Sequence, residues 1–497
     1  MNLIDKAVAV LSPEKALARA RARRALGIIN HYDGASKTRR TDGWRAIGSD
    51  ANAAIETALP RLRDVSRDLD RNNSVVRRAT RARTDAVVGS GIKWAFTAEN
   101  DDWRKELEAI ADDHFGTTAI DADGHSNLYG LQELAYRTKR VAGECLIRRR
   151  WRKPGDGFPL PYQIQLLEPE YLDETKNGRM DNGNLAVMGI EVNGFGKRVA
   201  YWLRKRHPGN ALIFGNSSVR VPATEIIHLY SKERPGQMRG VPDLAAAFAL
   251  FHDLADYDDA QLLRQKIAAC FAVFRTTPLD VEEDPDDPVG SEDPLEKIQP
   301  GIIEDLAIGQ DVTIAEPPQP GGYGEFMKVK MHQAAAAGDV AYSSLSGDYS
   351  QVNFSSARME RLSLNPGIEA EQRNLMIGQM MHGVARWNGE ALSLKRAVQG
   401  KVTPGYRNSW VPPVQPMLDP KAEEQAQRGM IRDGLEPWSW AVKKRGYDPD
   451  KVIEAYAKDA ERFDQNGLVF DVDGRVVSAQ GQNNGLDEQK GNTNGEG

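Results

Sequence analysis

The spacing of apolar residues predicts helices over much of the chain and strands in its second quarter. Apolar side chains recur at the period of an amphipathic helix over residues 59–88, 102–115 and 127–140. The first of these runs is followed by Gly89 and Gly91. Two glycines so close together favour a turn, so we expect the helix to end there.

Short runs rich in β-branched and aromatic residues follow, separated by Gly, Pro and Asn. Such runs are typical of the strands of an antiparallel meander. The predicted strands are residues 145–151, 162–167, 185–192, 197–204 and 225–230. Because helices flank these strands in the sequence, the fold class that we predict is α+β and mostly helical.

The longest predicted helix covers residues 242–270. It would begin with Pro242 in its first turn and Asp243 near the positive end of the helix dipole. At a rise of 1.5 Å per residue it would be about 43 Å long, and such a helix needs neighbours along its whole side. An ordinary core helix is the simpler alternative.

Further helices are expected toward the C-terminus. They are residues 325–337, 354–364, 368–387, 421–443 and 449–466. Residues 338–350 are rich in Gly, Ser and Asp and predict a loop, and Asn365-Pro366 should interrupt a helix because proline disfavours the helical conformation of the residue before it. The Pro-rich residues 411–420 predict an extended connector, and the Gly/Asn/Gln-rich residues 476–497 predict disorder.

Charge is distributed unevenly along the chain, whose formal net charge is −6. Residues 1–93 carry a net charge of +9. They are either solvated helical faces or an arm that contacts nucleic acid or an acidic partner. Residues 280–325 contain 14 acids and one base, Lys297. This stretch is either a self-repelling disordered loop or an inserted functional subdomain, and the strand-like pattern of residues 301–314 favours the second.

Composition excludes several classes of protein. Hydrophobic residues make up 40% of the chain, yet no apolar run approaches the roughly 20 residues that span a bilayer, so we expect no membrane segment. The N-terminal residues lack the apolar core of a secretory signal, so we do not expect export. The two cysteines, Cys145 and Cys270, are too few for a disulfide scaffold or a structural zinc cluster.

Motifs that carry catalysis are missing from the sequence. The stretch nearest to a phosphate-binding loop, residues 189–198, has the wrong spacing and is better explained as a turn between strands. His228 is expected to be a hydrogen-bonded strand histidine. The segments that begin at Asp121 and Asp471 resemble calcium loops but lack the acidic twelfth position, so we expect turns. We therefore predict no enzyme, no catalytic residue, no cofactor and no metal site.

Several segments, taken in order, resemble the portal proteins of lambda-like tailed bacteriophages. They are RATRARTDAVVGSGIKWAF at 78–96, GECLIRR at 143–149, QLLEPEYL at 165–172, PATEIIHLY at 222–230, RPGQMRGVP at 234–242 and DYSQVNFSSAR at 348–358. The last resembles a family signature through Asp348, Tyr349, Ser350, Asn353, Phe354, Ser355, Ser356 and Arg358. The resemblance covers about residues 20–410, and the joint order of the segments carries it.

The resemblance implies a homo-oligomeric ring, typically of twelve subunits, at one vertex of a capsid. Double-stranded DNA would be packaged and ejected through its channel. The partners would be the large terminase subunit, the head–tail connector, and the major capsid and scaffold proteins, without any membrane. The protein would be located in the virion, and in the host cytoplasm during assembly.

The resemblance also implies a portal-type division of the chain. Residues 1–92 would be a basic helical region, 93–241 an α+β wing, 242–270 the stem helix and 271–320 an acidic clip. Residues 321–352 would form a second stem helix and the tunnel-loop region, 353–475 the C-terminal wing and crown helices, and 476–497 a disordered tail.

Two sets of charged residues are candidates for function. Asp284, Asp286, Asp287, Glu304 and Asp305 would lie on the clip, where carboxylates repeated around a ring repel DNA weakly and offer a docking surface. Lys328, Lys330 and Arg358 would be the bases nearest the DNA, or alternatively partners in intersubunit salt bridges. Two other functions stay open, namely a DNA-binding processing enzyme or adaptor that uses the basic N-terminal region, and a capsid-associated scaffold without a channel.

Overall fold

A computed structural model describes residues 48–210, 217–268, 273–275, 303–305, 322–350, 352–414 and 419–468, together with single positions between 14 and 43. The chain divides into two units, residues 1–54 and 55–497. Short helix α3 (Ala51–Ile55) lies at the border in sequence. Most of the helix predicted before residue 48, and the predicted tail at 476–497, lie outside the described residues.

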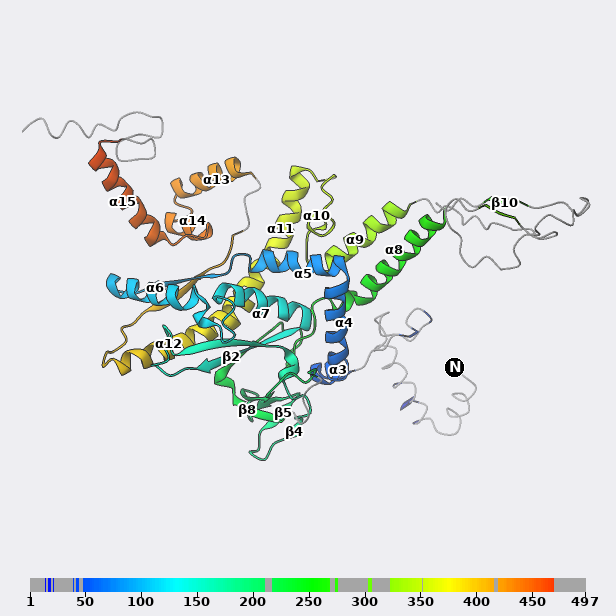
Figure 1. The fold of residues 1–497 in the computed structure, drawn as a ribbon, viewed down its shortest axis with the longest axis horizontal. Helices are drawn as coiled ribbons and strands as arrows, with labels where there is room; N and C mark the ends of the chain where they lie inside the picture. Colours follow the sequence, from blue (N-terminus) through cyan, green and yellow to red (C-terminus); the bar gives the residue numbers. More distant parts are fainter. Residues whose placement is uncertain are drawn as a thin grey trace, which may run out of the picture. The chain divides into compact units, whose positions relative to one another are not determined.

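The second unit contains helices and strands in the proportion expected of a mainly helical α+β fold (Figure 1). Its α- and π-helices in the described residues are α4 (Leu59–Asn72), α5 (Ser74–Val87), α6 (Asp101–Phe115), α7 (Leu128–Ala142), α8 (Phe248–Ala268), α9 (Tyr323–Ala337), α10 (Tyr342–Ser346), α11 (Phe354–Ala370), the π-helix η6 (Glu371–Met381), α12 (His382–Val398), α13 (Pro420–Arg432), α14 (Trp438–Lys444) and α15 (Pro449–Asn466). Single 3₁₀ turns are η2 (Thr118–Ile120), η3 (Pro169–Tyr171), η4 (Ala223–Glu225) and η5 (Ala245–Ala247).

The strands in the described part of the chain form four sheets rather than one. They are β1 (Lys93–Thr97), β2 (Glu144–Trp151), β3 (Tyr162–Leu167), β4 (Gly178–Arg179), β5 (Leu185–Val187), β6 (Ile190–Val192), β7 (Arg198–Arg204), β8 (Ser218–Pro222), β9 (Ile226–Tyr230), β10 (Val273–Arg275), β11 (Ile303–Asp305) and β12 (Arg407–Val411). The sheet orders are β3-β2-β9, β4-β5-β6-β7-β8, β1-β12 and β10-β11. All pairs are antiparallel except β10 with β11.

The prediction of a single meander over residues 145–230 is therefore wrong in part. Strands β4 to β8 do form a meander, but β2, β3 and β9 make a separate sheet. The predicted strand 185–192 is a hairpin, β5 and β6, because Met188 and Gly189 both take positive φ values, of 45° and 84°. This left-handed pair of residues forms a tight two-residue turn.

Strand β2 separates two hydrophobic cores. Cys145 and Ile147 point to one face and belong to a large core built with α7, η6 and α12. Leu146 points to the other face and belongs to a smaller core shared with the β4–β8 sheet, including Tyr201 and Leu203. Because side chains alternate along a strand, every second residue of β2 faces the neighbouring sheet.

The helix break predicted at Asn365-Pro366 does not occur. Helix α11 runs through Pro366 and continues directly into η6 and α12. Proline inside a helix costs about 3 kcal/mol. Ile368 and Met376, on the C-terminal side of the proline, are both buried in the large core, and this packing offsets the cost. Similarly, the helix predicted at 421–443 is divided into α13 and α14, because Gly434 has a positive φ of 72°.

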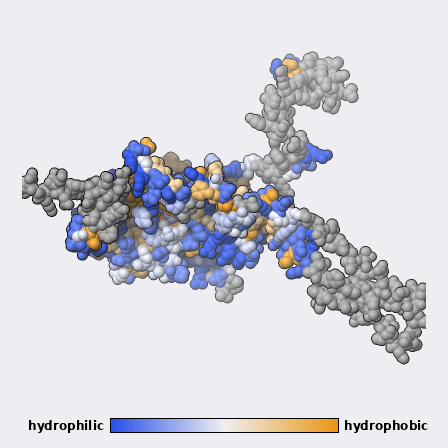
Figure 2. Space-filling view, turned by 90° about the horizontal axis from the view of Figure 1, so that it is seen from above, coloured by the Kyte–Doolittle hydropathy of each residue, from blue (hydrophilic) through white to orange (hydrophobic). Residues whose placement is uncertain are grey.

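Other predictions are confirmed. The helix predicted over residues 59–88 ends as expected, at Val87 just before the two glycines, but it is divided into α4 and α5 because Asn73 is extended and caps α5. Helix α15 has the predicted bounds. Asp121 accepts hydrogen bonds from the backbone N–H groups of Asp123, His125 and Ser126, so this segment is a turn. The turn expected within residues 189–198 lies between β6 and β7. Figure 2 shows a mostly hydrophilic face with small, scattered hydrophobic patches.

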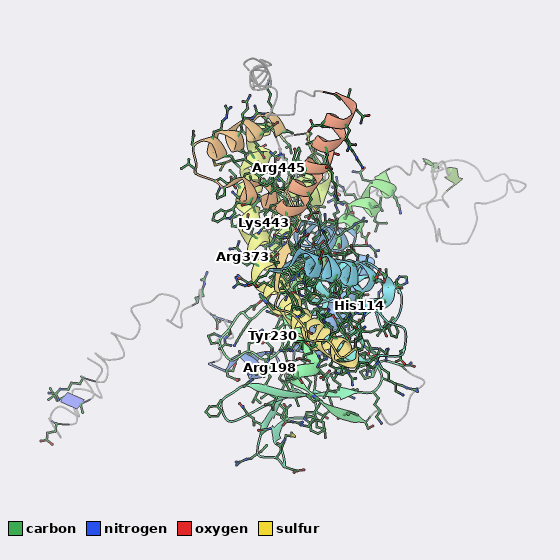
Figure 3. All side chains as sticks on the ribbon, turned by 90° about the vertical axis from the view of Figure 1, so that its left-hand side faces the viewer. His114, Arg198, Tyr230, Arg373, Lys443 and Arg445 are labelled. Carbon is green, nitrogen blue, oxygen red and sulfur yellow. The ribbon has the colours of Figure 1, made fainter. Side chains whose placement is uncertain are left out.

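His114, labelled in Figure 3, is a fully buried histidine of the large core's helical layer. Its ring packs against Phe115 and Tyr162, and neither ring nitrogen has a hydrogen-bond partner among the described residues. Burial, with a smaller contribution from the charge of Lys395, lowers the pKa of His114 to about 3. The folded protein therefore keeps this imidazole neutral while an unfolded chain protonates it below about pH 6.5.

We expect His114→Phe to weaken the dependence of stability on pH. As the pH falls from about 6.5 to about 3, the unfolded state of the parent binds one more proton at this residue than the folded state, so stability falls by up to about 1.4 kcal/mol per pH unit. Urea unfolding midpoints between pH 7 and pH 4 measure this slope. The control is His125→Gln, at an exposed histidine, and an unchanged slope in the His114 variant would refute the assignment.

Candidate functional site

Helices α8 and α9 form an antiparallel pair whose base is buried and whose far half is not (Figure 1). The base lies in a third hydrophobic core with α5. This core contains Val76, Ala79, Leu244, Ala247, Phe251, Leu254, Ala334, Ala335, Val340 and Leu345. Further along the pair, the ring of Tyr257 packs against Tyr323 and Phe326, with centroids 5.9 and 4.7 Å apart. The Tyr323 hydroxyl also donates a hydrogen bond to Asp258.

Helix α8 begins later than the sequence predicts. It starts at Phe248, after the 3₁₀ turn η5, and not at Pro242. Asp243 does not cap the helix, because its carboxylate is used elsewhere. It accepts hydrogen bonds from the buried Lys139 of α7, at 2.8 and 3.0 Å, and forms an ion pair with Arg140 at 3.4 Å. These ion pairs fix the segment that leads into α8 to helix α7.

Helix α9 is fixed to the same neighbours. Arg140 donates to the carbonyl oxygen of Gly338, the residue that ends α9. Arg83 of α5 donates to the carbonyl oxygen of Asp339 at 3.0 Å. One arginine, Arg140, therefore contacts both the entry to α8, through Asp243, and the exit from α9, so the base of the pair is a rigid support for its far half.

The far half of the pair carries aliphatic side chains that the described residues leave exposed. Leu262 and Leu263 of α8 are 53% and 59% exposed, and Val329 of α9 is 57% exposed. Phe326, which lies three residues before Val329 in α9, is also exposed. Scattered exposed apolar residues are common, but several on one pair of helices indicate a contact surface.

The loop after α9 is more ordered than the sequence predicts. Residues 338–350 contain the short helix α10, which is held by Glu360 of α11. The Glu360 carboxylate accepts from the backbone N–H of Tyr342 at 2.8 Å and from the hydroxyl of Ser343 at 3.1 Å. Asp348 then accepts from the N–H of Ser350 at 2.9 Å. Its pKa is lowered first by its hydrogen bonds to Ser350 and also by the positive charge of Lys328.

The signature residues at 348–358 build the start of α11. Asn353 accepts from the N–H of Ser356 at 2.8 Å, while the Ser356 hydroxyl accepts from the N–H of Asn353 at 3.0 Å. This reciprocal arrangement is a capping box. Tyr349 and Phe354 are exposed, and so are Ser355 and Arg358. The local role of this motif is therefore to end the loop and begin a helix.

The basic candidates lie on two elements. Lys328 is exposed on α9 and close enough to Asp348 to influence its pKa. Lys330, also on α9, donates to Gln333 and lies over the ring of Phe326. Arg358 is exposed on α11. Among the described residues none of these three bases forms a salt bridge with a carboxylate, so intersubunit salt bridges stay an alternative to DNA contact.

The acidic candidates are largely outside the described part of the chain. Asp284, Asp286 and Asp287 lie outside it. Glu304 and Asp305 belong to β11, which pairs in parallel with β10 in the register Phe274 with Glu304 and Arg275 with Asp305. Strand β10 follows α8 in the sequence and β11 precedes α9, so the two strands connect the far ends of the helix pair to the acidic stretch.

A cavity of about 540 Å³ lies between α5, α10 and α11, beneath the loop. Its lining combines apolar residues with Arg83, Asp339, Glu360 and Arg361. Arg83 pairs with Glu371 of η6 and donates to the carbonyl oxygen of Asp339, so its charge is already balanced. We find no set of groups here that fits a reaction.

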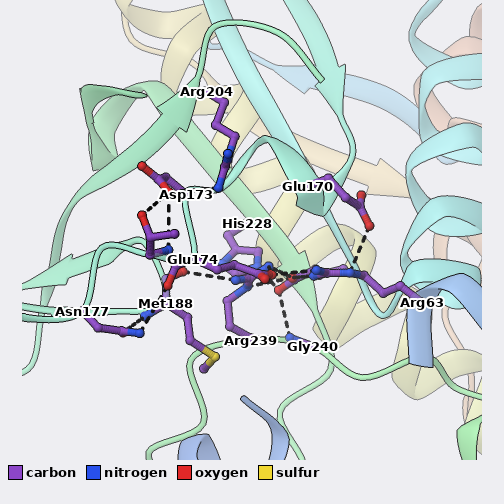
Figure 4. Close-up of polar contacts among 12 residues, drawn as sticks. Arg63, Glu170, Asp173, Glu174, Asn177, Met188, Arg204, His228, Arg239 and Gly240 are labelled. Atoms are coloured by element: carbon purple, nitrogen blue, oxygen red, sulfur yellow. Dashed lines mark hydrogen bonds and ion pairs between the residues drawn. The ribbon is translucent and has the colours of Figure 1, made fainter. Parts of the chain in front are cut away.

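A buried ionic cluster joins the segment before α8 to the β3-β2-β9 sheet (Figure 4). The Glu144 carboxylate pairs with the guanidinium of Arg239 at 2.6 Å and is hydrogen-bonded to His228 at 2.8 Å. All three side chains are at most 1% exposed. Glu174 pairs with both Arg239, at 3.2 Å, and Arg63 of α4, at 2.6 Å. His228 is thus the hydrogen-bonded strand histidine that the sequence predicts.

Electrostatics in this cluster favour the charged carboxylate. Burial alone would raise the pKa of Glu144, but Arg239 and the hydrogen bond from His228 outweigh it, so the pKa is far below its usual range. Burial lowers the pKa of His228 despite the nearby carboxylate, which keeps the imidazole neutral. The cluster is a structural ion pair with a neutral histidine beside it.

The segments GECLIRR at 143–149 and RPGQMRGVP at 234–242, about a hundred residues apart, meet at this cluster. Gly143 has a positive φ of 89°, and a Cβ there would lie 2.5 Å from the carbonyl carbon of Val241. A Cβ on Gly240 would lie 2.1 Å from the carbonyl oxygen of Gly143. Gly240 also donates its N–H to Glu144 at 2.9 Å. Only glycine fits at both positions, because the two backbones are in contact.

One group in the described residues has metal-ligand spacing, namely Glu168, Glu170 and His207. Its carboxylates are already paired. Arg67 pairs with Glu168 at 3.2 Å and with Glu170 at 2.8 Å, and Arg63 pairs with Glu170 at 3.0 Å. These arginines neutralise the charge that would attract a cation, so the group is an ion-pair network. In the described part of the chain, no helix is both long enough and apolar enough to cross a bilayer.

Sequence reasoning missed a group of arginines on β2. The prediction of a strand over residues 145–151 takes no account of the segment RRRWRK at 148–153, five of whose six residues are basic. That density of charge was the signal that could have indicated a surface for an anionic partner. The buried cluster around Glu144 gave no comparable signal, because its members are scattered along the sequence.

Comparisons with known proteins agree with one another. A family model described as phage portal protein, lambda family, matches residues 37–372. The probable portal protein of Halomonas phage phiHAP-1 is 26% identical over 477 residues, covering 90% of this chain and 89% of that protein. The portal protein of Escherichia phage N15 is 20% identical over 490 residues, covering 86% and 88%.

Among solved structures, similar chains come from gene transfer agent (GTA) particles. The neck of an empty GTA particle computed with C6 symmetry matches with 13% identity and a TM-score of 0.39, covering 82% of this chain and 96% of that chain. The neck of the native GTA particle computed with C12 symmetry matches with 14% identity and a TM-score of 0.39, covering 77% and 94%. TM-scores this low support no inference about assembly.

Proposed function

The chain belongs to the lambda family of phage portal proteins, and we propose that it assembles into a closed homo-oligomeric ring at one vertex of a capsid. Double-stranded DNA passes through the central channel during packaging and ejection. The ring docks the large terminase subunit during packaging and the head–tail connector afterwards, and it contacts the major capsid and scaffold proteins. The protein is then part of the virion, and it is present in the host cytoplasm during assembly.

In this proposal the segments of the chain correspond to the wing, stem, clip, tunnel loop and crown of a portal protein. Residues 93–241 form the wing, and α8 is the stem helix that begins at Phe248. The acidic residues 271–320 form the clip, α9 is the second stem helix, and the loop that contains α10 lies at or near the tunnel. The C-terminal helices α13, α14 and α15 form the crown.

One observation beyond family membership supports the ring. Leu262, Leu263 and Val329 lie uncovered on the far half of the α8–α9 pair. Fully burying a leucine side chain is worth about 1.5–3 kcal/mol, so these residues favour a neighbour that covers them. In a closed ring each subunit buries this surface of its neighbour against a different surface of its own. Because the ring closes, every copy of the surface is covered.

The electrostatic part of the proposal concerns movement of DNA. Phosphate contacts with lysine and arginine dominate DNA affinity, and a channel with many bases would hold the duplex in place. The clip would carry Asp284, Asp286, Asp287, Glu304 and Asp305, with few bases near them. We propose that these carboxylates repel the duplex weakly at the channel mouth and form the docking surface for the packaging motor.

Electron microscopy or native mass spectrometry of the purified full-length chain tests the proposal. We expect rings with a central hole and a mass that is a multiple of the 55.0 kDa subunit. A monomer or dimer that binds DNA tightly and in a salt-dependent manner would instead indicate a DNA-processing adaptor that uses the basic N-terminal region. ATP hydrolysis by the purified chain would also contradict the proposal, because the motor would be a separate polypeptide.

A variant in which Lys328, Lys330 and Arg358 are all replaced by glutamine tests the proposed channel bases. If these residues contact the duplex, we expect assembled particles to retain less of their packaged DNA, because three charges per subunit are lost around the ring. The amount of DNA in purified particles, measured after incubation at raised salt, gives the result. The matched control replaces Arg428, Arg432 and Lys443, which are exposed on the C-terminal helices. Equal retention in both variants would remove these bases from the channel.

A further inference from the structure

Three arginines form a stripe on one face of β2 and its continuation. Arg148, Arg150 and Arg152 alternate along the strand, so their side chains share the face that Leu146 presents to the β4–β8 sheet. Residue 152 stays in register, because its N–H donates to the carbonyl oxygen of Pro161 at 2.9 Å. We call Arg148, Arg150 and Arg152 the arginine stripe. At about 3.4 Å per residue, neighbouring members are about 6.8 Å apart along the strand.

The arginine stripe is not neutralised by carboxylates. Arg150 donates to the amide oxygen of Gln165 at 2.9 and 2.6 Å, and Arg152 donates to that of Gln163 at 2.7 Å. No salt bridge involves any of the three stripe arginines among the described residues. Glutamine orients a guanidinium without cancelling its charge, so the stripe is positioned and remains cationic.

The arginines on either side of the stripe are different. Arg149 points to the opposite face, where it pairs with Glu225 at 2.6 Å and with Glu390 of α12. Arg220 of β8 pairs with the buried Glu191 at 2.8 Å. The chain thus neutralises the arginines that serve its own fold and leaves the stripe unpaired.

Mutual repulsion among the stripe arginines is consistent with a surplus of positive charge. Burial lowers the pKa values of Arg148 and Arg150, and in each case the next arginine along the stripe lowers the pKa further, while the charge of Glu225 offsets part of this effect at Arg148. A guanidinium remains protonated at neutral pH, so the surplus appears as an electrostatic cost within the isolated protein. An anion that binds between these groups would remove that cost.

The stripe lines a groove of about 390 Å³ between β2 and strand β8. The opposite wall is made of Val219, Arg220, Val221 and Pro222, and the groove is also lined by Trp151 and by the ion pair of Arg149 with Glu225. Its two walls come mainly from strands β2 and β8, and the stripe arginines recur at every second residue along one face of β2. An extended peptide has the same repeat, and its alternate side chains would meet successive arginines.

We infer that the groove between β2 and β8 binds an extended acidic peptide segment of a partner protein, with an aspartate or glutamate at every second position facing the arginine stripe. Guanidinium groups bind carboxylates through two parallel hydrogen bonds, which suits this pairing. A DNA duplex fits less well, because it is a stiff rod whose phosphates cannot enter a groove of this size between two sheets. The inference does not depend on ring assembly, since one subunit contains the whole groove.

Fluorescence anisotropy of the purified full-length chain with labelled peptides tests this inference. The first probe is an octapeptide that alternates glutamate with threonine. The second has the same composition with the four glutamates in one block, and the third is a duplex of about 20 base pairs. We expect the alternating peptide to bind about tenfold more tightly than the block peptide, because only its carboxylates match the repeat of the stripe.

The variants are R148Q/R150Q/R152Q and the charge-matched control R428Q/R432Q/K443Q. We expect the first to weaken binding of the alternating peptide by about tenfold or more and the control to leave it unchanged. The single variant R148Q covers the case in which the triple variant does not fold, because the Arg148 side chain forms no hydrogen bond with another described residue. It should weaken binding of the alternating peptide about threefold. Equal binding of both peptides, or equal affinity in the stripe and control variants, would overturn the inference. Duplex binding that is lost only in the stripe variants would assign the groove to nucleic acid instead.

Discussion

Replacing Leu262 and Leu263 by glutamate should convert the proposed ring into single subunits. Both side chains are more than half exposed in one subunit, so the substitutions have little to disturb within it. In a ring they would lie in every interface, and each would bring a charge into a surface that loses water. Burying an unpaired carboxylate costs several kcal/mol, which exceeds what a leucine contact contributes.

Native mass spectrometry at a fixed subunit concentration measures the expected loss. The parent should give rings, and L262E/L263E should give the mass of one 55.0 kDa chain. The control places glutamate at Leu185 and Phe195, which are 49% and 98% exposed on the β4–β8 sheet, and it should still form rings. Circular dichroism and thermal unfolding check that each variant folds. Rings of unchanged mass in L262E/L263E would show that this surface is not the interface.

The second large effect concerns stability. We expect Arg239→Met to destabilise the protein by about 3–5 kcal/mol, because it leaves the fully buried Glu144 carboxylate without its main counter-charge. Glu144 would keep its hydrogen bonds to His228 and to the N–H of Gly240, together with a longer ion pair to Arg63 at 3.7 Å, and these balance its charge only in part. The segment before α8 would loosen as a result, since Arg239 also donates to the carbonyl oxygen of Met188.

Chemical unfolding midpoints at a fixed subunit concentration measure this loss. The double variant E144Q/R239M should be more stable than R239M alone, because it removes the uncompensated charge together with its partner. The control Arg81→Met removes an arginine that is 76% exposed and 3.7 Å from Asp85, and it should change stability by no more than about 1 kcal/mol. A similar midpoint for R239M and R81M would contradict the role that we give to the cluster.

Local signals in the sequence predict many elements correctly. Strand β3 and helix α15 have the predicted bounds, and α5 ends where two glycines follow it. The capping box of Asn353 and Ser356 also depends only on residues three positions apart. Such features succeed because hydrogen bonds within a few residues decide them.

The errors arise where distant residues outweigh a local preference. Pro366 should break a helix, but burial of Ile368 and Met376 in the large core maintains it. Asp243 follows Pro242 as a residue typical of the first turn of a helix, but its carboxylate pairs with Lys139 and Arg140 of α7 and caps no helix. In each case the sequence shows the preference and contains no sign of the partner, because the partner is far away along the chain.

The sequence by itself determined the family, the α+β class, the uneven charge and the residues of the 348–358 signature, since these follow from the order and local spacing of residue types. Only the tertiary structure decided that Glu144 pairs with Arg239, that Lys328 lies near Asp348, and that the arginine stripe faces a groove while Arg149 is neutralised. The physical reason is that ion pairing and burial depend on distances in space, and charges of identical type gain opposite roles according to what packs against them.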